Sequence, residues 1–158
     1  MQLPALVFMS DYDEFVDYFE AIYAIFKRDF VDSKPTFEGK VLRLKSYPFI
    51  DGKEYTFYHF THSGNDESGR LPDLRRMERI AWPRPFIDYS NDSSLKVWKN
   101  KRGTRTRVLI FHEVENYLVI LEERENYILP WTGYLVEYSN RKEKLLREYE
   151  EYLKTKTA

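Results

Sequence analysis

The fold is indicated most clearly by the stretch LKVWKNKRGTRTRVLIFHEVENYLVILEERENYILPWTGYLVE, residues 95–137. It contains four runs rich in β-branched and aromatic side chains, which favour the pleated, half-buried surface of a sheet. The runs are residues 95–98, 107–113, 117–122 and 127–137. Short breaks that contain Gly or Asn separate them, at residues 101–103, 115–116 and 125–126. Because strands joined by so few residues run antiparallel, the stretch predicts an antiparallel meander.

A helical pattern precedes this stretch and another follows it. From Ser10, which can cap a helix, apolar side chains recur at three- and four-residue spacing until the Lys34-Pro35 pair, whose proline disfavours helical dihedrals in the residue before it. Residues 141–154 alternate Lys or Arg with Glu around spaced Leu and Tyr side chains, which is typical of a charged helix. These segments predict an N-terminal helix and a closing C-terminal helix.

The segment between the first helix and the sheet contains turn signals and short apolar runs. Residues 41–50 and 55–60 predict two extended segments joined by the Asp51-Gly52 turn, although Pro48 weakens the first. Residues 63–69 are polar, include two glycines and predict a loop.

A short basic helix is predicted over residues 71–80, with Pro72 near its start and Pro83 and Pro85 ending it. The expected fold class is α+β. The N-terminal helix and the short basic helix would pack on one face of a four- to five-stranded antiparallel sheet, with the C-terminal helix closing the fold.

Length and composition restrict the classes of function. A chain of 158 residues that is 42% apolar and 17% aromatic suits one folded domain over residues 1–158. The sequence has no cysteine, which excludes disulfides, a thiol nucleophile and Cys-bearing metal sites, and we expect no cofactor and no metal. Acidic residues from Asp11 onward argue against a signal peptide, and no apolar run reaches about 18 residues. We therefore expect a soluble, cytoplasmic protein without a membrane partner.

The overall charge gives no sign of a polyanion-coating protein. Lys and Arg number 25 against 26 Asp and Glu, for a formal net charge of -1. Any interaction with nucleic acid must therefore depend on local clusters of basic side chains.

Two of the three histidines lie close together and are candidates for acid–base chemistry. His59 and His62 fall at the end of a predicted extended segment and the start of the polar loop, where a side chain can be held and still reach solvent. A histidine titrates near neutral pH, so either could take up and return a proton. Either could equally fill a structural position, and His112, inside a predicted strand, is expected to be structural.

The predicted basic helix carries three arginines in five residues, Arg75, Arg76 and Arg79. A guanidinium binds a phosphate through two parallel hydrogen bonds and stabilises charge on phosphoryl oxygens. Residues 75 and 79 lie one turn apart on one face, and Arg76 points elsewhere. The alternative is that Asp73 and Glu78 neutralise these arginines in ion pairs.

A second basic stretch surrounds the first predicted hairpin. Basic side chains there could follow a nucleic-acid backbone while an aromatic side chain stacks on a base. The candidates are Lys96, Trp98, Lys99, Lys101 and Arg102, with Arg105 and Arg107 following. A solvated basic turn would have the same composition.

The last predicted strand contains Thr132 and Tyr134 on either side of Gly133, which permits close approach of the backbone. Core packing of Trp131 and Tyr134 is the structural alternative. The sequence contains none of the usual signatures of phosphate-binding loops, dinucleotide-binding turns, nucleophile elbows or zinc-protease helices.

Three of these segments resemble small phage- and prophage-associated proteins of the BECR group, which is named after barnase, EndoU, colicin-type and RelE nucleases. They are Tyr58-His59, residues 71–85 with the run Pro-Asp-Leu-Arg-Arg-Met-Glu-Arg, and Trp131-Thr132-Gly133-Tyr134. The resemblance spans about residues 55–137. The first and last helices fit the fold only by their pattern.

The resemblance implies a toxin- or phage-type endoribonuclease that cuts RNA without metal, through attack of the ribose 2′-hydroxyl on the neighbouring phosphate to leave a cyclic phosphate. It implies an active site on the exposed sheet face, with His59 as base or acid, Arg75 or Arg76 as phosphate clamp, and Thr132 with Tyr134 positioning the phosphate. His62 would supply the second proton carrier, or else Lys99 or Tyr134. RNA is the implied partner, and an inhibitory protein is a further candidate.

Two other functions stay open on the sequence alone. The first is a non-catalytic domain of the same fold that binds nucleic acid or a protein, with His and Arg side chains serving recognition. The second is a small-molecule pocket lined by tyrosines, which no feature of the sequence supports directly.

Overall fold

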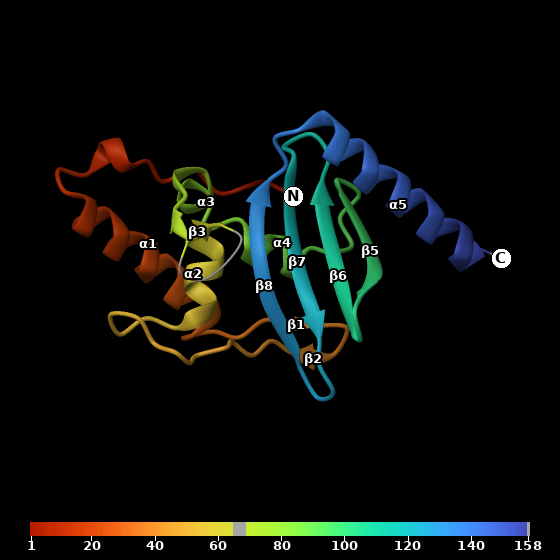
Figure 1. The fold of residues 1–158 in the computed structure, drawn as a ribbon, viewed down its shortest axis with the longest axis horizontal. Helices are drawn as coiled ribbons and strands as arrows, with labels where there is room; N and C mark the ends of the chain where they lie inside the picture. The colour runs from red at the N-terminus through yellow and green to blue at the C-terminus, as the bar shows by residue number, and fades with distance from the viewer. Residues whose placement is uncertain (65–68, 158) are drawn as a thin grey trace.

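The computed structural model describes residues 1–64 and 69–157 and has the α+β fold class that the sequence predicts (Figure 1). Its centre is a four-stranded antiparallel sheet in which neighbours along the chain are also neighbours in the sheet. The strands are β5 (Leu95–Arg102), β6 (Arg105–His112), β7 (Tyr117–Glu123) and β8 (Ile128–Leu135). The predicted meander is thus confirmed.

The first hairpin of the sheet is longer than its hydrophobic pattern suggests. β5 and β6 stay in register as far as Arg102 and Arg105, and Gly103 turns the chain with a φ of 61°. Residues 101–102 were expected to lie in a break but belong to β5, because the ladder of backbone hydrogen bonds does not require apolar side chains. The basic side chains of this hairpin therefore stand on two paired strands.

One face of the sheet packs against the helices of the N-terminal half. These helices are α1 (Phe15–Phe30), α2 (Tyr55–Thr61), α3 (Leu74–Glu78) and α4 (Pro83–Asp88). A buried cluster joins Ile22 and Phe26 of α1 and Phe57 of α2 to Val108 and Val119 of the sheet. Val108 and Val119 stand on neighbouring strands and share a face because side chains alternate along each strand.

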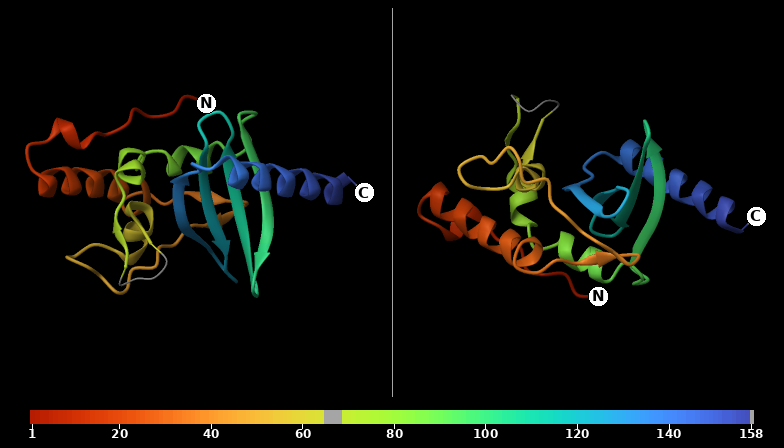
Figure 2. Two further views of the ribbon diagram at one scale, coloured as in Figure 1. Left: turned by 45° about the horizontal axis from the view of Figure 1, so that its top comes forward. Right: turned by 90° about the horizontal axis from the view of Figure 1, so that it is seen from below.

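The opposite face of the sheet is partly covered by α5 (Ser139–Thr157), which begins shortly after β8. Leu145 of α5 is fully buried with Trp98, Phe111 and Leu118 in a second apolar cluster. Figure 2 shows α5 on the side of the sheet away from α1. The predicted closing helix is thus present, and it covers the face opposite the N-terminal helices because its Leu and Tyr side chains form an apolar stripe of their own.

Residues 55–61 form the helix α2 and not the extended segment that the sequence suggested. All its residues except Tyr58 are buried, so apolar and aromatic side chains occur on every side and the helical period is hidden. Short apolar runs of this kind do not distinguish a buried strand from a buried helix. His59 therefore lies in a helix and His62 directly follows it, so the surroundings of both side chains differ from those expected at the end of an extended segment.

Most of residues 41–50 is irregular. β2 (Lys40–Val41) pairs with β1 (Thr36–Phe37). Leu42 forms an isolated parallel bridge to Ile128, the first residue of β8, and Ile50 forms an isolated antiparallel bridge to Lys53. The predicted Asp51-Gly52 turn is present, with φ values of 51° and 75° at the two residues.

The predicted basic helix is divided into shorter elements. β4 (Leu71–Pro72) pairs with β3 (His62–Ser63), and α3 begins after Asp73, whose side chain caps it. Pro83 starts α4 and does not merely end the preceding helix, since proline suits the first turn of a helix. The predicted loop at residues 63–69 falls largely on residues 65–68, which lie outside the described residues.

The N-terminal helix begins later than predicted. Ser10 lies in a short 3-10 turn, η1 (Met9–Asp11), and α1 starts after Glu14 without a side-chain cap. Over the part of the chain that is described, no helix is both long and apolar enough to cross a membrane.

Candidate nucleic-acid interface

The sheet face beneath α5 stays open toward the basic end of the first hairpin, where a hollow of about 310 Å³ lies. Five cationic side chains and one carboxylate line it, around Trp131, Thr132 and Tyr134 of β8. The charged residues are Lys101, Arg102, Arg107, Arg141, Lys144 and Glu148. This site, here called the basic hollow, is therefore strongly cationic within a chain whose overall charge is close to zero.

The sheet and α5 each contribute cations to the basic hollow. β5 and β6 supply Arg102 and Arg107, which stand on rigid paired strands. Arg141, Lys144 and Glu148 recur at three- and four-residue spacing along α5, so they share one face of the helix. Docking of α5 onto the sheet thus brings both groups together.

Arg107 is a cation held in a partly desolvated place. Its guanidinium lies over the Trp131 ring, 5.3 Å from the ring centroid, and its side chain is only 14% exposed. Burial lowers the pKa of Arg107, the nearby Arg102 lowers it further, and Glu122 acts in the opposite direction. A bound anion at this point would offset the cost of keeping the guanidinium charged.

Glu122 is the buried carboxylate nearest to Arg107, and three guanidinium groups share it. Arg124 forms the shortest ion pair with it, at 2.7 Å, while Arg105 and Arg107 each approach to 3.8 Å. One negative charge cannot neutralise three positive ones. The strand ends beneath the basic hollow therefore keep a surplus of positive charge.

Tyr134 lies at the border of the basic hollow. Its hydroxyl accepts a hydrogen bond from Arg141 at 3.2 Å, and the Arg76 guanidinium lies 5.2 Å from its ring centroid. On its other side a larger hollow of about 610 Å³ opens between α3 and the start of α5. Tyr134 and Arg141 line both hollows, so the two are neighbours.

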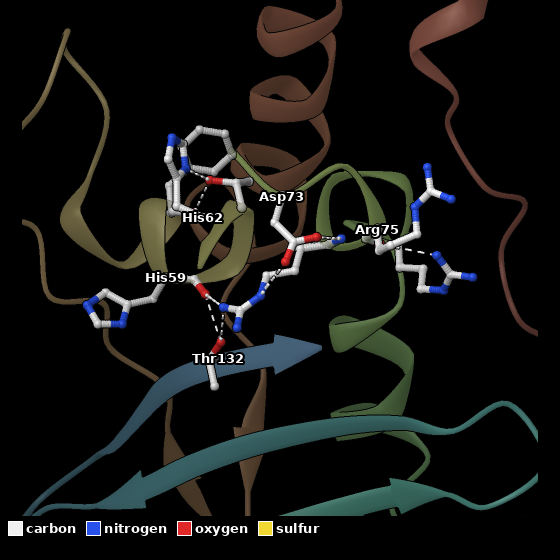
Figure 3. Close-up of polar contacts among 9 residues, drawn as sticks. His59, His62, Asp73, Arg75 and Thr132 are labelled. Atoms are coloured by element: carbon white, nitrogen blue, oxygen red, sulfur yellow. Dashed lines mark hydrogen bonds and ion pairs between the residues drawn. The ribbon is translucent and has the colours of Figure 1, made fainter. Parts of the chain in front are cut away.

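The His59 ring lies outside both hollows. Its residue is only 5% exposed, and the imidazole packs between the rings of Tyr55 and Trp131, with centroids 4.8 and 4.9 Å away. Figure 3 shows the ring pointing away from Thr132. The part of His59 that meets the predicted phosphate clamp is its backbone carbonyl, which accepts hydrogen bonds from Arg76 and Thr132.

Arg76 connects three elements through polar contacts. Its Nη1 atom donates to the His59 carbonyl at 2.9 Å and to the Thr132 hydroxyl at 3.0 Å, joining α2 to β8. Its Nε atom lies 3.5 Å from Asp73, which caps α3. Burial lowers the pKa of Arg76, and Asp73 acts in the opposite direction. These contacts assign Arg76 and Thr132 a structural role at the edge of the sheet.

His62 ends α2 and packs among aromatic side chains. Its ring lies 5.1 Å from Tyr58 and 6.1 Å from Phe19, and its Nδ1 atom is 2.9 Å from the Thr61 hydroxyl. Burial lowers the pKa of His62, and the positive charges of Arg70 and Arg76 lower it further. The two histidines line a separate hollow of about 240 Å³, which Arg70 also lines. The predicted catalytic arrangement required them to meet Arg75 or Arg76, and neither of these arginines lines that hollow.

The other two arginines of the predicted basic helix pair with one carboxylate. Arg75 binds Glu78 at 2.8 Å, and Arg79 lies 3.4 Å from the same side chain and over the Trp82 ring. Figure 3 shows Arg75 directed away from Thr132. Ion pairing by Asp73 and Glu78, the alternative considered from the sequence, is the arrangement observed.

The basic stretch of β5 divides between the two faces of the sheet. Trp98 is fully buried beneath α5 and cannot stack on a base, and Lys96 pairs with Glu113. Lys99 faces the other way and forms ion pairs with Glu38 and Glu123. Of the basic stretch predicted to follow a nucleic-acid backbone, Lys101, Arg102 and Arg107 line the basic hollow.

Three residues of the basic hollow were absent from the predicted site. Trp131 was assigned to core packing, yet it is partly exposed beneath Arg107. Arg141 and Lys144 were assigned to a generic charged helix, although their spacing already placed them on one helical face. The missing information was the side of the sheet on which that helix docks, which local sequence does not encode.

A comparison with known proteins gives no independent assignment, because no family model, curated protein or solved structure matches the chain. Nor do the described side chains include a group of three or more His, Asp or Glu residues placed to hold a metal ion.

Proposed function

We propose that this chain is an RNA-binding protein that holds the sugar–phosphate backbone in the basic hollow. The observation that carries the proposal is the convergence of five cationic side chains with one carboxylate around Trp131 and Tyr134. Guanidinium groups bind phosphate oxygens, and aromatic side chains at the same place offer stacking surfaces for bases. The resemblance to the BECR group, which implies a site on the exposed sheet face, points to the same surface.

Desolvation adds a second argument for an anionic ligand. Arg107 stays charged in a place where burial lowers its pKa and where Glu122 is shared with two other guanidinium groups. A phosphate would supply the missing negative charge at close range, where low dielectric strengthens the attraction.

The test is the salt dependence of RNA affinity, measured by fluorescence anisotropy on a short single-stranded RNA. We expect Arg107→Met to weaken binding by about tenfold and to reduce the slope of log K against log salt by about 0.7, the value for one lost phosphate contact on a single strand. Lys99→Met is the matched control, since this lysine pairs with Glu38 and Glu123 on the other face. Equal effects of the two variants would refute the basic hollow as the binding site.

We propose metal-independent RNA cleavage as a second candidate function, because a phenol occupies the border of the basic hollow. In such a reaction the ribose 2′-hydroxyl gives up its proton to a base and its oxygen forms a bond to phosphorus, while the bond from phosphorus to the 5′-oxygen breaks and that oxygen takes up a proton. Tyr134, next to Arg141, is the proton carrier that the geometry favours, since both histidine rings face other side chains.

Cleavage is tested with total RNA in excess EDTA, by searching for fragments that end in a cyclic phosphate. Tyr134→Phe should abolish such fragments and leave RNA affinity within about twofold, because the variant loses only the hydroxyl. Intact RNA with the unaltered protein would leave RNA binding without catalysis as the function.

A further inference from the structure

The larger hollow beyond Tyr134 has a chemical character different from that of the basic hollow. It lies where the end of β8, the link to α5, β3 and the start of α3 meet, and its volume of about 610 Å³ falls within the usual range of small-ligand sites, about 300–1,000 Å³. Its walls include two phenols, Tyr134 and Tyr138, and two carboxylates, Asp73 and Glu137, beside the arginines at 75, 76 and 141. We call it the Tyr138 hollow.

Most charged groups of the Tyr138 hollow are already engaged. Asp73 caps α3 and lies beside Arg76, and Arg75 pairs with Glu78. Glu137 differs from them, because it is exposed on the link between β8 and α5 and forms no hydrogen bond or ion pair with any other described residue. Tyr138, its neighbour, is 72% exposed. A carboxylate acceptor and an aromatic ring are thus available to a ligand side by side.

We propose that the Tyr138 hollow binds one unpaired nucleobase of the RNA held in the basic hollow, and that it favours a base with an exocyclic amino group. The inference rests on the proposed RNA-binding function. Tyr134 and Arg141 line both hollows, so a backbone phosphate beside Arg141 places an adjoining base at the Tyr138 hollow. A base paired in a duplex cannot enter it, which makes single-stranded RNA the substrate class.

The preference for an amino group follows from the acceptor at the rim. A carboxylate accepts a hydrogen bond from the amino group of cytosine, whereas uracil carries a carbonyl oxygen at the same position and is repelled. Stacking on Tyr138 is indifferent to the base, since every base has an aromatic face. Glu137 therefore sets the preference and Tyr138 contributes affinity.

Three fluorescein-labelled oligonucleotides of equal length test the proposal: oligo(C), oligo(U) and an abasic chain. With the unaltered protein we expect oligo(C) to bind about tenfold more tightly than oligo(U), and the abasic chain to bind most weakly. Glu137→Gln should bring the ratio of the two affinities below about twofold. Asp17→Asn, which removes an exposed carboxylate from α1, is the control and should preserve the ratio.

Tyr138→Ala separates stacking from a general loss of binding. We expect it to weaken oligo(C) and oligo(U) alike, by about tenfold, and to leave the abasic chain unaffected. Salt-sensitive binding of all three chains with equal affinity would overturn the nucleobase site while RNA binding stands. Failure of every chain to bind would instead refute the proposed function itself.

Discussion

Replacing Arg76 with methionine should destabilise the fold strongly, although the residue was expected from the sequence to serve as a phosphate clamp. Methionine fills much of the same space but cannot donate to the His59 carbonyl or to the Thr132 hydroxyl. These two contacts connect α2 to β8, and the pair with Asp73 connects both to α3. The substitution therefore loosens three elements together.

The magnitude follows from the contacts of the guanidinium. A hydrogen bond to a charged group contributes about 1.5–3 kcal/mol, and Arg76 donates two of them from a side chain that is only 16% exposed. The cost of burying the charge, visible in its lowered pKa, offsets part of this gain. We expect Arg76→Met to lower the free energy of unfolding by about 2–4 kcal/mol.

Urea unfolding monitored by tryptophan fluorescence measures the effect. With a slope of about 2 kcal/mol per molar urea, the midpoint should fall by about 1–2 M at an unchanged slope. Arg75→Met is the matched control, because its guanidinium is 53% exposed and Glu78, its partner, keeps its contact with Arg79. A loss below about 1 kcal/mol in Arg76→Met, together with weaker RNA binding, would show that Arg76 serves a ligand.

Two further predictions concern stability. Because the pKa of His62 is lowered from 6.5 in the folded state, the unfolded chain binds more protons, and the free energy of unfolding should decrease as the pH falls below about 6.5. His62→Gln should flatten this pH dependence in urea titrations. An unchanged pH dependence in the variant would exclude His62 as its source. Gly133→Ala should cost about 1–3 kcal/mol by thermal unfolding, since a Cβ atom there would lie 2.5 Å from the Tyr117 hydroxyl, and a neutral effect would mean that this ring moves freely.

The sequence was most informative where a pattern extends over many residues. Continuous runs of β-branched and aromatic side chains marked β6 and β7 correctly, and spaced Leu and Tyr side chains marked α5. It failed at Tyr55–Thr61, where nearly complete burial removes the polar face by which a helix is usually detected. The pattern of residues alone cannot distinguish a buried helix from a buried strand, because it records hydrophobicity and not the surroundings of each side chain.

The site was only partly predictable for a related reason. Lys101, Arg102 and Tyr134 were chosen by residue type and do line the hollows, whereas the His59 ring faces Trp131. The direction of a side chain depends on whether its residue lies in a helix or in a strand. Because α2 was predicted to be extended, the predicted direction of the His59 side chain was wrong. The place of Arg141 in the site could not be predicted from the local sequence, because it depends on where α5 docks.

Both the burial of one sheet face and the charge of the basic hollow depend on the docking of α5. The part of α5 that buries Trp98 against Leu145 also contributes Arg141 and Lys144 to the basic hollow. Removal of α5 at the exposed link of Glu137 and Tyr138 would therefore expose the apolar face of the sheet and take two cations from the basic hollow. A chain shortened at that link should both aggregate and lose affinity for an anionic ligand.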